Sequence, residues 1–145
     1  MIKYKTVYVD VNVFLDFVCK HRDSLDKQHA KEVFTLIDFN KIIVCTNITT
    51  LAFAKSFLRK EYSENQAKQA LIKALTFVQI TPSNQKIVDE ALASNFFDWE
   101  DAMHYYSAFH YGADCIVTRN TKDFKHSKIP ILTPKQFIQN YLNNQ

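Results

Sequence analysis

The chain has 145 residues, 47% of them hydrophobic and 23% charged, and its formal net charge is +3 at pH 7. This length and composition are typical of a globular protein with a proper core, so we expect one domain over residues 1–145. No apolar run approaches the ~20 residues of a membrane-spanning helix, and Asp10, Asn12 and Asp16 interrupt the first apolar stretch, where a secretory signal would be continuous. We therefore expect a cytoplasmic protein. The charge excess is too small to predict a nucleic-acid partner by itself.

Cysteine and glycine usage exclude several classes of protein. Cys19, Cys45 and Cys115 include no CxxC pair, which argues against a disulfide framework or a zinc site. We expect Cys45 and Cys115 to be buried as small hydrophobic residues. Gly112 is the single glycine of the sequence. The P-loop and the glycine-rich dinucleotide motif both need several glycines at which backbone approaches phosphate, so ATP-hydrolysing and NAD-dependent enzymes are excluded.

The predicted elements alternate between short apolar strands and helices. In chain order they are a strand at residues 4–9, a helix at 12–19, a polar stretch at 20–28, a helix at 29–40, a strand at 42–45, helices at 49–60 and 64–76, a strand at 77–81, helices at 84–94 and 99–111, strands at 114–118 and 129–132, and a helix at 134–142. Ser63 and Asp98 are predicted N-caps, and Gly112 is predicted to end the helix that Asp98 begins. This alternation predicts a parallel sheet covered by helices on both faces.

Acidic residues stand at the ends of several predicted elements. Asp10 follows the first strand, Asp101 lies in the first turn of the helix at 99–111, and Asp123 comes after the strand at 114–118. Ligands of parallel sheets gather beyond the carboxyl ends of the strands, which is where we expect Asp10 and Asp123. Unit charges ~4 Å apart repel by roughly 4 kcal/mol at an effective dielectric constant near 20, so three carboxylates would not stay ionised together unaided.

A divalent cation would offset this repulsion, and all-oxygen ligands favour Mg²⁺ or Mn²⁺ over Zn²⁺. Water bound to such a cation can be deprotonated near neutral pH and can attack phosphorus. The neutral side chains of Asn12 and Thr118 are suitably placed to orient the carboxylates. Each acid also has a plainer interpretation: Asp10 as a helix cap, Asp101 as a first-turn acid that complements the helix dipole, and Asp123 as a turn residue.

Basic residues occur where phosphates could be contacted. Arg119 and Lys122 follow the strand that precedes the last acid, and Lys55 and Arg59 are four residues apart, so they share a helix face. A solvated loop and a solvated helix face are the plainer interpretation of both pairs. The spacing of the histidines predicts no metal site, and we expect His104 to be either a helix-surface or a packed histidine.

Six segments of the chain follow one another in an order known from one protein family. They are residues 9–16 (VDVNVFLD), 98–102 (DWEDA), 106–108 (YSA), 111–120 (YGADCIVTRN), 122–124 (KDF) and 131–137 (ILTPKQF). In this order they resemble PIN domains and, within that family, the VapC-like toxins of bacterial toxin–antitoxin pairs. The resemblance covers nearly the whole chain, and the ordered set is far more specific than the opening motif alone.

The resemblance implies a three-layer α/β/α sandwich with a mainly parallel sheet of about four to five strands. It implies an Mg²⁺- or Mn²⁺-dependent endoribonuclease with an RNA substrate, an antitoxin partner and a homodimeric state. The implied catalytic and metal-binding residues are Asp10, Asp101 and Asp123. The supporting residues are expected to be Asn12, Asp16, Glu100, Thr118 and Asn120. The expected RNA-binding residues are Arg119, Lys122, Lys55 and Arg59.

The sequence departs from the family in one respect. The family usually carries a second acid in the helix after the second strand, but that position falls here at Phe53 or Ala52, and no acid occurs between Asp38 and Glu61. This leaves open a second interpretation, a weakened or inactive PIN-like module that binds RNA or a protein partner. A phosphatase of the haloacid dehalogenase class is excluded, because Asn12 occupies the position of its general-acid Asp.

Overall fold

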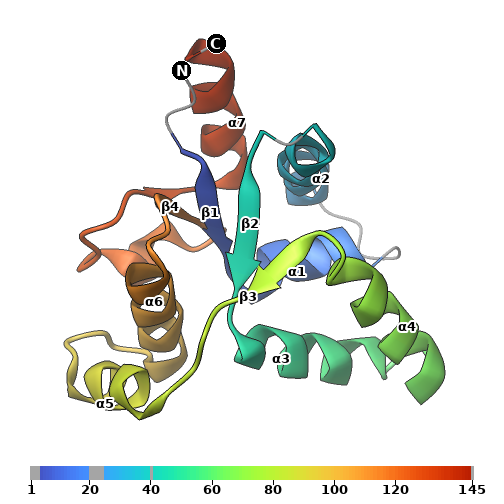
Figure 1. Cartoon of the computed structure of the whole chain (residues 1–145), viewed down its shortest axis with the longest axis horizontal. Coiled ribbons are helices and arrows are strands. Elements are labelled where there is room, and N and C mark those ends of the chain that lie inside the picture. The colour runs from blue at the N-terminus through green and yellow to red at the C-terminus, as the bar shows by residue number, and fades with distance from the viewer. Residues whose placement is uncertain (1–3, 20–24, 40, 145) are drawn as a thin grey trace.

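The computed structural model describes residues 4–19, 25–39 and 41–144 (Figure 1). Its strands are β1 (Thr6–Val9), β2 (Ile43–Thr46), β3 (Val78–Ile80), β4 (Cys115–Val117) and β5 (Ile131–Leu132). Its helices are α1 (Val11–Val18), α2 (Leu25–Asp38), α3 (Ile48–Leu58), α4 (Glu64–Ala74), α5 (Gln85–Ala93), α6 (Trp99–Tyr111), α7 (Pro134–Asn143) and the short 3₁₀ helix η1 (Thr121–Phe124). The predicted alternation of strands and helices is confirmed.

The sheet is parallel throughout, with the strand order β3-β2-β1-β4-β5. β1 is central, since Val7 is in register with Val44 of β2 and with Cys115 of β4. From β1 the chain builds the sheet outward through β2 and β3, and it then returns to place β4 on the other side of β1. The boundary between β1 and β4 is therefore the topological switch point, where open parallel sheets bind ligands beyond the carboxyl ends of their strands.

The alternation of side chains along β1 divides the core between the two faces of the sheet. Val7 and Val9 belong to a cluster with residues of α1, α2 and α7, whereas Tyr8 belongs to a cluster with Tyr105 and Ala108 of α6. Figure 1 shows the layers, with α1 to α4 on one side of the sheet and α5 and α6 on the other. Burial on both faces explains why the strands are almost continuously hydrophobic. The predicted three-layer α/β/α sandwich is confirmed.

Side-chain caps fix the ends of several helices. Ser63 and Thr133 each form a capping box with the Gln three residues later, and Pro134 occupies the first turn of α7. Asp98 caps the start of α6, and the helix ends at Gly112, whose φ of 86° is the left-handed conformation that favours glycine. The predicted caps of α4 and α6 are thus confirmed.

One predicted boundary is wrong. α2 begins at Leu25, within the polar stretch at residues 20–28 and before the predicted start at residue 29. Lys and Gln in this stretch have high helix propensity, but they supply no apolar spacing by which a helix could be recognised. Residues 20–24 and 40, on which parts of these predictions fall, lie outside the described residues. The other boundaries agree to within about two residues.

Two findings bear on the class of protein. Cys19, Cys45 and Cys115 are free thiols and all three are buried, as expected for cysteines that pack as hydrophobic residues. None of the helices that the described residues form combines the length and the apolar character needed to cross a membrane.

Candidate metal and RNA site

Asp10 occupies the switch point at the end of β1. Its exposed fraction is 7%, and it caps α1 by accepting a hydrogen bond at Oδ1 from the backbone N–H of Val13 at 3.1 Å. Its other oxygen, Oδ2, accepts a short hydrogen bond from the hydroxyl of Thr118, the residue that follows β4. Burial raises the pKa of Asp10, while the bonds from Thr118 and Val13 and the charge of Arg119 act in the opposite direction. Asp10 is therefore a buried acid whose ionisation depends on its neighbours.

The segment around Thr118 holds this arrangement in place. Thr118 is fully buried, and its hydroxyl oxygen accepts a hydrogen bond from the backbone N–H of Asn120 at 3.1 Å. A backbone hydrogen bond from Asn12 lowers the pKa of Asp10. The structure therefore places Thr118, Asn12 and Asn120 at this site. Thr118 acts through its side chain, whereas the contacts described for Asn12 and Asn120 come from the backbone.

Asp101 brings α6 into the same site. Its pKa is raised to about 7, first by burial and then by repulsion from Asp98, Asp123, Asp10 and Glu100 in that order. Such repulsion requires that the charges lie near one another, so the structure gathers the three acids expected to be catalytic into one electrostatic group. Glu100, expected to be a supporting residue, belongs to the same group.

Asp98 is a site residue that the sequence analysis missed. Its charge raises the pKa of Asp101 more than any other neighbouring charge does, and its Oδ1 accepts hydrogen bonds from the backbone N–H groups of Glu100 at 2.7 Å and Asp101 at 3.3 Å. The sequence signal for it is the presence of three acids within residues 98–101, where the capping pattern predicts only an N-cap at Asp98. Asp98 and Glu100 bring negative charge from α6, whereas the family usually adds it from the helix after β2.

Asp16 and Arg119 form an ion pair that adjoins these acids. Asp16 is fully buried on α1, and its Oδ2 lies 3.7 Å from Nη1 of Arg119. Arg119 directly follows Thr118, and its charge also lowers the pKa of Asp10. A buried carboxylate needs such a cation to remain ionised. The contacts of Arg119 described here are thus with carboxylates of the chain, and its role toward RNA stays a prediction.

A pocket of about 280 Å³ lies beside the acids. It is lined by residues of the loop before α6, of the first turn of α6 and of the segment around η1: Asn95, Phe97, Asp98, Asp101, Lys122, Asp123, Lys125 and His126. Part of the lining is acidic and part is basic. Lys122, which is expected to bind RNA, is one of the basic residues of this lining.

The oxygen donors gathered here suit a hard divalent cation, because carboxylates are the ligands that Mg²⁺ and Mn²⁺ prefer. Repulsion from four neighbouring carboxylates contributes to the raised pKa of Asp101, and a cation would offset this repulsion. Within residues 4–19, 25–39 and 41–144, no three His, Cys, Asp or Glu side chains converge closely enough to ligate one ion as they stand. The donor set fits a cation in chemistry and in charge, and binding would require the side chains to move together.

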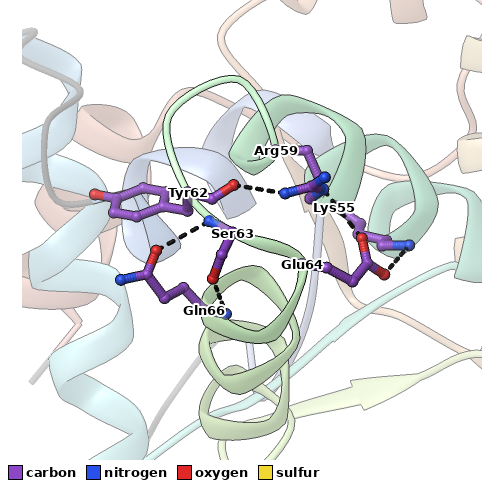
Figure 2. Close-up of polar contacts among 6 residues, drawn as sticks. All are labelled: Lys55, Arg59, Tyr62, Ser63, Glu64 and Gln66. Carbon is purple, nitrogen blue, oxygen red and sulfur yellow. Dashed lines mark hydrogen bonds and ion pairs between the residues drawn. The ribbon is translucent and has the colours of Figure 1, made fainter.

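Lys55 and Arg59 lie away from this pocket, at the contact between α3 and α4 (Figure 2). Both side chains reach Glu64 at the start of α4, where Lys55 Nζ is 2.5 Å and Arg59 Nε is 3.0 Å from its carboxylate oxygens. Arg59 also donates from Nη1 to the carbonyl oxygen of Tyr62 at 2.9 Å. The pKa of Glu64 is lowered, chiefly by its hydrogen bond with Lys55. These contacts close the turn between the two helices.

α3 supplies no carboxylate to the candidate site. Phe53 and Ala52, the expected positions of the missing acid, are both exposed. Glu64 on the adjoining helix is engaged by Lys55 of α3 and by Arg59, which caps the end of α3. The departure from the family that is visible in the sequence is therefore not compensated by this part of the fold.

His104 is a packed histidine, which is one of the two expected alternatives. It is 4% exposed on α6, and its Nδ1 is 2.7 Å from the hydroxyl of Tyr8, which also accepts a hydrogen bond from the backbone N–H of Asn47 at 3.2 Å. Burial lowers the pKa of His104 to about 4, so the ring is neutral at neutral pH.

Comparisons with known proteins agree with this fold. The family model described as PIN domain matches residues 6–122. A search among curated proteins gives no match. Because the family match covers most of the chain, the family that the six sequence segments suggest is confirmed.

Three of the similar solved structures come from bacteria. VapBC2 of Rickettsia felis, bound to a DNA fragment from their promoter, has a TM-score of 0.66 and 16% identity, with 88% of this chain and 98% of that chain covered. A toxin–antitoxin complex from Klebsiella pneumoniae has a TM-score of 0.65 and 21% identity, with 88% and 97% covered. Mycobacterium tuberculosis VapC20, a Sarcin-Ricin loop cleaving toxin, has a TM-score of 0.59 and 14% identity, with 76% and 86% covered. At these identities the similarity shows a shared fold.

Proposed function

Because the chain belongs to the PIN domain family, we propose that it is an Mg²⁺- or Mn²⁺-dependent endoribonuclease and the toxin of a toxin–antitoxin pair. The observation that carries this proposal is the group of carboxylates at the β1–β4 switch point, where burial and mutual repulsion raise the pKa of Asp101 to about 7. Acids that repel one another lower the stability of the folded chain. Groups with strongly perturbed pKa values are typical of functional sites.

Each acid has a role in the proposed hydrolysis that follows from its surroundings. Asp10, Asp101 and Asp123 would hold the cation, which when bound supplies a water of lowered pKa and polarises a phosphoryl oxygen. Asp10 is oriented by Thr118 and by its bond to the start of α1, so its carboxylate needs little reorganisation. Without a cation, burial and repulsion from its neighbours raise the pKa of Asp101 to about 7, and a bound cation would favour its ionised form.

The RNA substrate, the antitoxin partner and the homodimer belong to the same proposal. In its support, the neighbour from Klebsiella pneumoniae is a toxin–antitoxin complex, and VapC20 is a toxin that cleaves the Sarcin-Ricin loop. Lys122 and Lys125 at the pocket offer this chain cations for phosphate oxygens.

A second candidate function is an inactive PIN-like module that binds RNA or a protein partner. The observation in its favour is the exposed, acid-free surface of α3 at Ala52 and Phe53. A site with fewer ligands would bind a cation less tightly. Such a module would keep RNA binding and lack metal-dependent cleavage.

Cleavage of a mixed RNA pool by the purified chain, with Mg²⁺ or Mn²⁺ against EDTA, tests the proposal. Asp10→Asn is the informative variant, because the amide keeps the shape of the side chain and an oxygen for the helix cap while it removes the charge. Glu64→Gln makes the same chemical change at the α3–α4 contact and serves as its control. We expect metal-dependent products from the wild-type chain and from Glu64→Gln, and a loss of roughly 100-fold or more in Asp10→Asn.

Equal cleavage by the folded Asp10→Asn variant would contradict the assignment of the site. If no products form at any metal concentration while the folded protein still binds RNA, the binding module is the better description.

A further inference from the structure

Phe97 is an aromatic side chain that the fold leaves entirely in solvent. It lies in the loop between α5 and α6, directly before the cap of α6, and its relative exposure is 105%. Its neighbour Phe96 shows the contrast, since that ring packs against Tyr105 and Phe124. Leaving a phenyl ring in water forgoes the gain that burial would bring. Packing within the described chain therefore does not account for Phe97.

Phe97 lines the pocket that contains Asp101 and Asp123. A fully exposed ring that also lines a pocket stands at its rim, close to the proposed reaction centre. The same lining carries Lys122 and Lys125, and both are exposed. In the part of the chain that the structure describes, neither lysine forms an ion pair with a carboxylate, in contrast to the lysine of α3.

A second hollow of about 610 Å³ adjoins the pocket, because Asn95 and His126 line both. The second hollow is lined in part by aromatic rings: Phe96, Tyr105, Tyr106 and Phe109. Unpaired cations beside aromatic rings form the kind of surface on which single-stranded nucleic acid binds, since cations contact phosphates and rings stack on bases.

We propose that Phe97 stacks on a base of single-stranded RNA beside the scissile phosphodiester, while Lys122 and Lys125 contact its phosphates. The inference rests on the proposed nuclease function and assigns to Phe97 the role of a base-stacking residue at the pocket of that site. The phosphates of any RNA can contact the two lysines, and every base has a face on which the ring of Phe97 can stack. Stacking therefore adds affinity with little sequence preference.

Binding of a single-stranded RNA of about 12 nucleotides to the wild-type chain in EDTA, where the RNA is not cleaved, tests the inference. An end label reports affinity by fluorescence anisotropy, and 2-aminopurine, placed at one position after another, reports stacking by its quenching. The variants are Phe97→Ala and Phe97→Trp. Phe39→Ala is the matched control, because Phe39 is also exposed, at 66%, but lies between α2 and the amino end of β2, far from the carboxyl edge of the sheet.

We expect Phe97→Ala to bind roughly tenfold more weakly and to lose the 2-aminopurine quenching, whereas Phe97→Trp keeps both. Phe39→Ala should bind as the wild-type chain does. The salt dependence of Kd should be unchanged in Phe97→Ala, because no phosphate contact is removed. Under cleavage conditions this variant should raise KM more than it lowers kcat.

Unchanged affinity and quenching in Phe97→Ala would overturn the inference, and so would a wild-type chain that does not bind the RNA. A Phe97→Ala variant that binds RNA normally but no longer self-associates in light scattering would assign the ring to a protein contact and would also overturn the inference.

Weaker binding by Phe97→Ala, in a protein that cleaves no RNA, would support the stacking site and refute the nuclease. Normal binding by Phe97→Ala, in a protein that cleaves RNA, would refute the stacking site alone.

Discussion

Two clusters of charged side chains in this chain have opposite electrostatics. Beyond the ends of β1 and β4 several acids lie near one another, with Asp10 buried and Asp101 half-buried, and burial together with repulsion raises the pKa of Asp101 to about 7. At the contact between α3 and α4 one acid meets two cations in solvent, and the pKa of Glu64 is lowered. The second cluster satisfies its charges within the chain and fixes a turn. The first leaves negative charge in excess, which is why we regard it as the site of a ligand.

The largest expected effect on RNA binding distinguishes the basic residues of the two regions. Lys122→Ala combined with Lys125→Ala removes two phosphate contacts, so we expect RNA binding to weaken by roughly tenfold or more and the salt dependence to fall by about two charges. Lys55→Ala combined with Arg59→Ala should cost only about twofold, because Glu64 already engages both side chains. Fluorescence anisotropy in EDTA at several salt concentrations measures both effects. Equal losses in the two double variants would mean that the α3–α4 contact also binds RNA.

A smaller effect is expected when an acid is restored to α3. Phe53 is 52% exposed, so Phe53→Glu places a carboxylate on the surface without a burial cost. If the missing acid weakens the site, cleavage at limiting Mg²⁺ should rise by about fivefold, and Phe53→Gln should leave it unchanged. No gain in a folded Phe53→Glu variant would indicate that Asp98 or Glu100 already supplies the charge, or that the family position lies elsewhere.

The free energy of unfolding should respond to pH with opposite signs in the two regions. Asp101 binds its proton more tightly in the folded chain, so its ionisation lowers stability as the pH rises from 3.8, its ordinary pKa, to about 7. Asp101→Asn removes this cost and should raise the free energy of unfolding above pH 7 by on the order of 1 kcal/mol, with allowance for partial exposure. Below the ordinary pKa the variant and the wild-type chain should be equally stable. Denaturant unfolding in EDTA at the two ends of this range measures the difference.

Glu64→Gln gives the smallest effect and the other sign. The lowered pKa of Glu64 stabilises the folded chain above its ordinary pKa of 4.5, and this contribution is lost as the pH falls through the folded-state value. The variant should therefore be slightly less stable than the wild-type chain at neutral pH and equal to it in acid. Stabilisation by Glu64→Gln at neutral pH, as for Asp101→Asn, would contradict the contrast between the two regions.

Much of the fold could be predicted from the sequence because it depends on local patterns. Nearly every element follows from the buried strands, the helical spacing and the caps at Ser63, Asp98 and Gly112. Asp10 lies at the end of β1 because the first apolar strand ends there, and this does not depend on how the helices pack. The start of α2 could not be predicted, because its first turn is polar and leaves no apolar stripe to read.

The site was less predictable, because it depends on how side chains meet across elements. The pairing of Lys55 and Arg59 with Glu64 arises from the angle at which α4 packs on α3, which no local pattern reports. The difference between Phe96 and Phe97 is similar: two adjacent phenylalanines look alike in the sequence, but one joins the aromatic packing and the other stands in solvent. These are tertiary features, and they decide which residues are available to a ligand.

Calorimetric titration of Mn²⁺ into the metal-free wild-type chain, Asp10→Asn and Glu64→Gln tests the central claim most directly. We predict binding by the wild-type chain and by Glu64→Gln, and binding at least roughly tenfold weaker in Asp10→Asn. Equal affinity in Asp10→Asn, or no binding by the wild-type chain, would contradict the claim that the carboxylates at the β1–β4 edge form a cation site.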